Sequence, residues 1–133
     1  MEKLSANTNA LNWFEIPVTE SPRAKKFYET VFDMQMFSQD MMGMEMTFFP
    51  GDMENPSGKV SGALVKSEMH IPGATGAIVY LNANPSIQAV VDRIDPAGGK
   101  VIMPSTKISD EIGYMAFFMD TEGNRMALHA GNQ

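Results

Sequence analysis

Five side chains in this sequence have the chemistry to bind or transform a small molecule, and they fall on alternate residues of short apolar stretches. They are Trp13, Glu15, Tyr80, Asn82 and His129. A carboxylate, a phenol and an imidazole can exchange protons with a substrate, and burial in an apolar pocket raises a carboxyl pKa toward neutrality. An indole ring offers a wall for a flat ligand. All five are therefore candidate ligand-binding residues, with Glu15 and His129 as candidate catalytic residues.

Each candidate also has a structural interpretation that the sequence leaves open. Glu15 can pair with Arg125 or with a lysine at the dimer seam, and a single histidine near the end of a chain is commonly a solvated or hydrogen-bonded structural residue. Trp13 can simply pack against other apolar side chains. The second histidine, His70, lies in the segment SEMHIPGATG and is expected to be exposed to solvent.

The chain contains one order of elements twice, with an offset of about 65 residues. NWFEIPV at 12–18 and SPRAKKFYETVF at 21–32 predict a strand and a helix, and AIVYLNA at 77–83 and NPSIQAVVDRI at 84–94 predict the same pair again. Further short strands are predicted at 34–38, 44–49, 59–65, 100–103, 114–119 and 125–130. The sequence thus predicts one domain, 1–133, built from units at about 11–66 and about 76–131. Two such small units should pair around a shared cleft.

Alternation along the strands separates the candidate residues from the core. Successive strand residues point to opposite faces, so all five candidates should lie on the face away from the helices. The apolar residues expected to pack beneath the helices are Phe14, Ile16, Val79, Leu81, Met126 and Leu128. Ser21, followed by Pro22, is expected to cap the first helix at its N-terminus.

Composition and charge exclude several classes of protein. The net charge is −6 and the ten Lys and Arg residues are spread singly, so there is no basic face for nucleic acid. The absence of cysteine removes disulfides, thiolate nucleophiles and cysteine zinc sites. No apolar run approaches the roughly 20 residues of a membrane span, and the N-terminal MEKLSANTNALN has no apolar export segment. We therefore expect a cytoplasmic protein that binds neither nucleic acid nor membrane.

Six of the 13 methionines fall close together, between positions 34 and 46. They are Met34, Met36, Met41, Met42, Met44 and Met46. Thioethers can bind a soft metal such as Cu(I), but no His or Cys lies within the cluster to complete such a site. Methionine also fills cores and ligand pockets adaptably, and this is the interpretation we favour.

Three separated segments resemble one known family. EIPVTESPRAKKFYETVF at 15–32, GGKVIMPSTKI at 98–108 and GYMAFFMDTEGNRMALHA at 113–130 are similar to the vicinal oxygen chelate superfamily, particularly its small glyoxalase and bleomycin resistance proteins. The resemblance covers nearly the whole chain. It implies an α+β fold in which two βαβββ modules form a cupped mixed β-sheet, and it implies a homodimer.

The resemblance also implies where a metal would be held. Enzymes of the family usually bind a divalent metal through His, Gln or Glu on the inner strands. The matching positions here are Trp13, Ile78 or a neighbour, Ala127 and a residue near Gly62. None of these named side chains supplies the nitrogen, oxygen or sulfur ligand that such an ion needs. We therefore expect no metal and no cofactor.

Together these features predict a metal-independent protein that binds a small, partly apolar or aromatic molecule. The resemblance supports this because the family's antibiotic-resistance members act by holding a ligand. The alternative is a lyase, isomerase or dioxygenase acting on a small carbonyl or aromatic compound. It would use Glu15 as base, or a metal held by unusual ligands that include Glu15 and His129.

Overall fold

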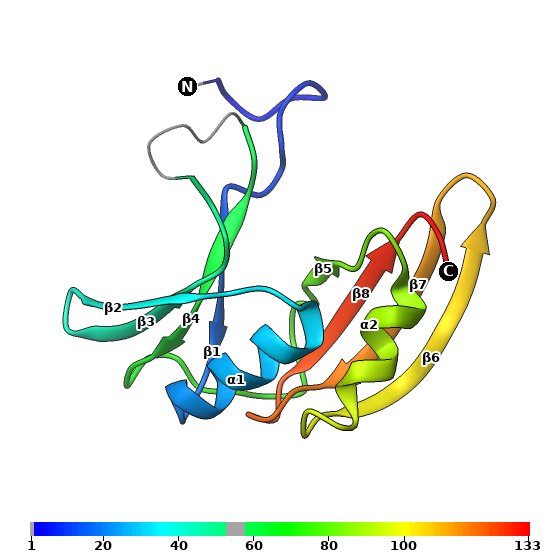
Figure 1. The fold of residues 1–133 in the computed structure, drawn as a ribbon. Coiled ribbons are helices and arrows are strands. Elements are labelled where there is room, and N and C mark those ends of the chain that lie inside the picture. Colours follow the sequence, from blue (N-terminus) through cyan, green and yellow to red (C-terminus); the bar gives the residue numbers. More distant parts are fainter. Residues whose placement is uncertain (1, 53–57) are drawn as a thin grey trace.

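Within the residues that the structure describes, 2–52 and 58–133, the chain folds into two consecutive modules of one helix and four strands each. Figure 1 shows their arrangement in the computed structural model. Module one contains β1 (Trp13–Pro17), α1 (Ser21–Phe32), β2 (Phe37–Met41), β3 (Met44–Phe48) and β4 (Ser61–Lys66). Module two contains β5 (Tyr80–Asn82), α2 (Ile87–Ile94), β6 (Lys100–Ser109), β7 (Gly113–Met119) and β8 (Arg125–Ala130).

Each module forms its own mixed sheet, and the two sheets have the same topology. The strand orders are β1-β4-β3-β2 and β5-β8-β7-β6. In both sheets the first strand of the module pairs in parallel with the last, and the other neighbours pair antiparallel. The two sheets diverge from each other while α1 and α2 lie in contact (Figure 1). The predicted α+β fold of two βαβββ modules is confirmed.

One hydrophobic core joins the two modules. Burial of apolar surface is the main force that stabilises such a core. Phe27 of α1 reaches Phe118 of β7, with ring centroids 6.0 Å apart, so the contact crosses from one module to the other. All six residues predicted to lie beneath the helices do so, since Ile16, Leu81, Met126 and Leu128 are buried in this core and Phe14 and Val79 pack against it.

The N-terminus of α1 is capped by a carboxylate from module two. The side chain of Glu122, in the turn between β7 and β8, is 0% exposed. It accepts hydrogen bonds from the backbone N–H groups of Thr19 and Glu20, at 2.8 and 2.9 Å, and from Arg23 Nε at 2.7 Å. The prediction that Ser21 caps this helix is wrong, because Glu20 is the N-cap residue and Ser21 Oγ is buried without a partner. The backbone N–H groups before the first turn of α1 thus find their acceptor in a residue about a hundred positions away along the chain.

We call the contacts of Glu122 and Asp120 with α1 the intermodule clip. Two ionisable groups in this clip have shifted pKa values. Burial alone would raise the pKa of Glu122, but the hydrogen bonds from Arg23 and from the backbone before α1 lower it to about 2. Next to it, the Asp120 carboxylate accepts a hydrogen bond of 2.7 Å from the hydroxyl of Tyr28. Burial, together with the Asp120 charge, raises the pKa of Tyr28 well above its ordinary value. The clip is therefore a buried, charged link between α1 and the last hairpin.

Element boundaries differ from the prediction mainly in module two. β5 is short, and α2 begins at Ile87 after Ser86, whose hydroxyl accepts a hydrogen bond of 3.2 Å from Ala89 N. β6 extends to Ser109, far beyond the predicted 100–103, because it stays paired with β7 through several register shifts. None of the described helices is long and apolar enough to cross a membrane.

Candidate functional site

The five candidate residues lie on the sheet faces that point away from the helices. In module one, Phe14 and Ile16 take the core side, which leaves Trp13 and Glu15 on the opposite side. In module two, Leu81 takes the core side, and its neighbours in β5 face the other way. Tyr80 pairs with Ala127, and Asn82 pairs with His129. We call these helix-free sides the concave faces of module one and module two.

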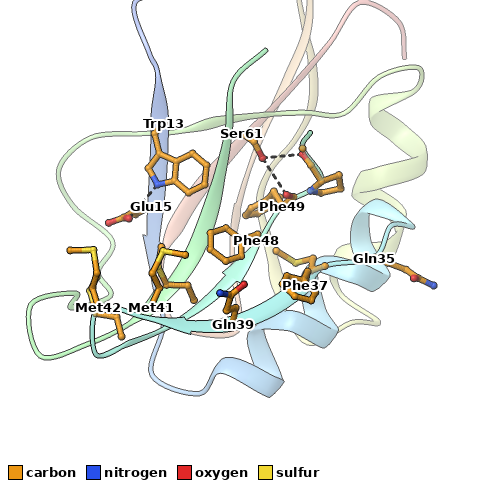
Figure 2. A pocket seen from close by; sticks show the side chains of 15 residues that line it. Trp13, Glu15, Gln35, Phe37, Gln39, Met41, Met42, Phe48, Phe49 and Ser61 are labelled. Atoms are coloured by element: carbon orange, nitrogen blue, oxygen red, sulfur yellow. Dashed lines mark hydrogen bonds between the residues drawn. The ribbon is translucent and has the colours of Figure 1, made fainter. Parts of the chain in front are cut away.

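The concave face of module one contains a large apolar cavity, which we call the Met-lined pocket. Its volume is about 820 Å³, within the range of small-molecule sites. Trp13 and Glu15 lie on one side, Phe48 and Phe49 lie beside them across the pocket, and the exposed Met41 and Met42 lie near Glu15 (Figure 2). The remaining lining residues are Gln35, Met36, Phe37, Gln39, Met44, Met46, Pro50, Gly51 and Ser61.

The floor of this pocket is a hydrophobic cluster separate from the main core. It consists of Met46, Ala63 and Val65, with Trp13, Met44 and Phe48 packed against it. The rings of Trp13 and Phe48 are tilted at 55°, with centroids 6.1 Å apart. The small side chains of β4 leave room between these larger walls. The methionines between 34 and 46 serve both as core and as pocket lining, since Met36 also belongs to the main core.

Among the described residues that line the Met-lined pocket, Glu15 is the one ionisable side chain, and it is held from two sides. Its Oε2 accepts a hydrogen bond of 3.2 Å from Trp13 Nε1, and its Oε1 accepts one of 2.8 Å from His70 Nε2. His70 Nδ1 in turn lies 2.6 Å from Ser67 Oγ. Within the described residues of one chain, the ionic partner of Glu15 is His70. A pairing with Arg125 or a lysine at a dimer seam stays a prediction.

His70 contacts the candidate residue Glu15, a contact that the sequence did not predict. It was expected to be exposed, but its side chain is only 19% exposed because the turn at Ser67–His70 folds it onto Glu15. The available signal was local: Ser67 and His70 stand three residues apart directly after β4, the spacing of a tight turn. Nothing local showed that this turn would reach β1.

The concave face of module two carries a smaller and more polar cavity. Its volume is about 430 Å³, and its lining residues are Tyr80, Leu81, Asn82, Asn84, Ile108, Ile112 and His129. His129 Nε2 donates a hydrogen bond of 2.7 Å to the Ile112 carbonyl, which leaves Nδ1 as the free acceptor. Asn82 Oδ1 accepts from Asn84 Nδ2 at 2.8 Å. The Tyr80 ring meets Phe117 edge-on, at 6.1 Å.

Within one chain the five candidates therefore form two groups. Trp13 and Glu15 line the Met-lined pocket, whereas Tyr80, Asn82 and His129 line the cavity of module two. The structure does not bring Glu15 and His129 into one cavity of the chain.

The residues at the family's metal positions do not fit a metal. Trp13 and Ala127 lie on the concave faces, but neither side chain can ligate a divalent ion in the usual way. Ile78 lies just before β5. Gly62 points toward the helices, since an added Cβ there would stand 2.6 Å from the ring of Phe14. In the part of the chain that the structure describes, no three His, Cys, Asp or Glu side chains gather closely enough to hold a metal ion.

A family model described as "Glyoxalase/Bleomycin resistance protein/Dioxygenase superfamily" matches residues 10–128. The chain therefore belongs to this superfamily, and the resemblance seen in its sequence is confirmed.

Two curated relatives are similar over most of the chain. "Putative glyoxylase CFP32" of Mycobacterium tuberculosis is 29% identical over 124 residues, a match that covers 92% of this chain and 46% of that protein. The chain thus spans about half the length of this relative. A "Glyoxylase-like domain-containing protein" of Didymella fabae is 32% identical over 124 residues, covering 89% of this chain and 91% of that protein.

Solved structures share the fold. TnmS3, described as an antibiotic binding protein from Streptomyces sp. CB03234, superposes with a TM-score of 0.66. The sequences are 21% identical, and the match covers 95% of this chain and 98% of that one. At this level of identity the likeness establishes the common fold.

Proposed function

We propose that this chain is a small-molecule-binding protein that holds a flat, largely apolar ligand in the Met-lined pocket and needs no resident metal. The observation that carries the proposal is a cavity of about 820 Å³ with aromatic and methionine walls and, among the described lining residues, a single carboxylate. Apolar pockets with a few fixed polar groups are the usual form of ligand sites. Glu15, fixed by Trp13 and His70, supplies the polar group that orients the ligand.

The side chains that line the pocket support binding of apolar ligands with different shapes. Methionine is unbranched and polarisable, so it adapts to different apolar surfaces. Phe37, Met41 and Met42 are 65%, 41% and 86% exposed although they line the pocket. Exposed apolar side chains gathered at one concavity are typical of an interaction site. The fold neighbour TnmS3, described as an antibiotic binding protein, uses the same architecture for binding.

Independence from metal is part of the proposal. It rests on the side chains at the family's metal positions, where tryptophan and alanine replace nitrogen and oxygen ligands. Ligand recognition would then depend on apolar contact and on the Glu15 carboxylate. Residence in the cytoplasm and the absence of nucleic-acid binding stay predictions from the sequence.

We further propose that the protein is a homodimer in which the concave face of module two from one copy covers the Met-lined pocket of the other. Both faces expose apolar side chains around a cavity: Phe37 and Met42 on module one, Tyr80 and Ile112 on module two. A second copy would bury these side chains. It would also bring Tyr80, Asn82 and His129 toward Trp13 and Glu15, completing the predicted set.

An enzyme with Glu15 as base is the second candidate. The hydrogen-bonded chain from Ser67 through His70 to Glu15 favours it, because such a chain fixes the orientation of a carboxylate at a pocket wall. Glu15 would remove a proton next to a carbonyl group of the ligand. Exchange of that proton for deuterium in D₂O, lost in Glu15→Gln, would show this activity.

The binding proposal is tested with Nile red, a neutral flat dye whose fluorescence rises in apolar surroundings. We expect saturable binding of one dye per chain, weakened at least about tenfold by Trp13→Ala because the aromatic wall is lost. Met44→Gln should weaken binding as well. Its matched control is Met69→Gln, since Met69 is 91% exposed and lies away from the pocket. Equal effects of the two methionine substitutions, or unchanged binding in Trp13→Ala, would refute the site.

A further inference from the structure

A third cavity lies where the two modules meet, and we call it the intermodule cavity. It has a volume of about 410 Å³ and lies between β1, the start of β8 and the linker that includes residues 71–77. Of the residues that line the Met-lined pocket, only Glu15 also borders this one. It is therefore a separate space, large enough for a small ligand.

Arg125 gives this cavity its chemistry. Its Nε is buried without a hydrogen-bond partner, and its Nη2 donates a hydrogen bond of 3.0 Å to the Gly76 carbonyl. Among the described residues, Arg125 forms no ion pair with an acidic side chain. A guanidinium group carries five N–H donors in a planar fork that matches a carboxylate. The Arg125 side chain lines the cavity, so a carboxylate bound there can accept hydrogen bonds from the guanidinium.

The other two arginines of the chain are already satisfied. Arg23 Nε donates to Glu122, and Arg93 Nε donates a hydrogen bond of 2.8 Å to the Val31 carbonyl. The Nε of Arg125 alone among these three lacks a partner in the described part of the chain. Arg125 is thus the arginine that lines this cavity while its Nε has no partner within the described part of the chain.

The remaining walls narrow the class of ligand. Ile71 and Val79 are apolar, and Glu15 is the one acidic side chain that borders the cavity. The Glu15 carboxylate is committed to Trp13 and His70. A single guanidinium with a carboxylate nearby favours a ligand with one negative charge over a doubly charged phosphate. We propose that the intermodule cavity binds a small monocarboxylate with a compact apolar body, held by Arg125.

The test follows the Nε–H resonance of Arg125 in ¹⁵N-labelled protein while benzoate is added. Benzoate is a monocarboxylate with an apolar ring, benzamide is its neutral counterpart, and inorganic phosphate is the dianionic alternative. We expect the Arg125 resonance to move saturably with benzoate and to stay in place with benzamide. A resonance that does not respond to benzoate, or that responds equally to benzamide or more strongly to phosphate, would overturn the proposal.

Substitutions place the interaction at the side chain. Arg125→Lys keeps the charge but loses the fork, so benzoate affinity should fall about tenfold, and Arg125→Gln should abolish measurable binding. Lys66→Met, which removes a half-exposed cation that is not among the residues lining the cavity, should leave affinity unchanged. If Arg125→Gln does not fold, the benzoate affinity of Arg125→Lys and the response of the wild-type Arg125 resonance still test the proposal. Met44→Gln alters the Met-lined pocket but not the lining of the intermodule cavity, so it should bind benzoate normally, and failure of the Met-lined pocket and failure of this site are distinguishable.

Discussion

The two concave faces are built on the same sheet topology, yet their chemistry differs. Module one offers an apolar cavity of about 820 Å³ floored by a hydrophobic cluster of its own. Module two offers a cavity of about 430 Å³ with a phenol, two amides and an imidazole. The helix-facing sides must be apolar in both modules because they share one core, whereas the concave faces are under no such constraint. The two modules therefore share a sheet topology and an apolar core, while their concave faces can differ in chemistry and in role.

The largest expected effect is a loss of stability when the link between the two modules is removed. Glu122→Gln removes the carboxylate that links module two to α1 and should lower the free energy of unfolding by about 3 kcal/mol at pH 7. The pKa of Glu122 in the folded protein, about 2, lies below its ordinary 4.5. Its contribution is thus fully present above about pH 4.5 and is lost as the pH falls toward 2.

Urea unfolding at several pH values measures this directly. The difference between wild type and Glu122→Gln should shrink steadily from pH 5 to pH 2, following the titration range of the clip. Glu20→Gln is the matched control, since Glu20 also lies near Arg23 but its side chain is 64% exposed, and it should change stability by less than about 0.5 kcal/mol. A difference that is independent of pH would show that Glu122 does not act through its charge.

The second prediction asks whether the two faces meet across copies of the chain. Light scattering should give twice the chain mass of 14.6 kDa. Trp13→Ala and His129→Ala should each lose high-affinity dye binding. An equimolar mixture should regain about a quarter of the wild-type sites, because half of the dimers are mixed and each has one intact site. A monomer near 14.6 kDa, or a mixture that regains nothing, would mean that the faces work separately.

The third prediction concerns the Glu15 carboxylate of the apolar face. His70→Ala removes the hydrogen bond that fixes Glu15 Oε1, so dye affinity should fall about two- to tenfold, as expected for one hydrogen bond. His70→Gln can keep a donor and should restore part of the loss. Glu68→Ala, an exposed residue of the same turn, serves as control. No change in His70→Ala would show that the orientation of Glu15 is irrelevant to binding.

The smallest expected effect is that of removing metal. Neither face offers a set of metal ligands among the described residues, so EDTA should leave the melting temperature unchanged. A metal at a hundred times its Kd would stabilise the folded protein by about 2.7 kcal/mol, which a melting curve detects readily. One tightly bound ion per chain, found by elemental analysis, would contradict the proposal.

What the sequence by itself determined follows from local periodicity. The helix at 21–32, the strand at 125–130 and the buried set around Ile16 and Leu128 were all predicted, because alternation and helical spacing report which face of each element is buried. The same periodicity placed Trp13 and Glu15 away from the helices, as the structure has them.

What only the tertiary structure decided are contacts between residues distant along the chain. Glu122, and not the predicted Ser21, caps α1. His70 contacts Glu15, and the five candidate residues lie in two cavities. Local patterns state which way a side chain points, but they carry no information about what approaches it from another module. Those partners are fixed by how the two sheets and their linker pack, which is a property of the whole fold.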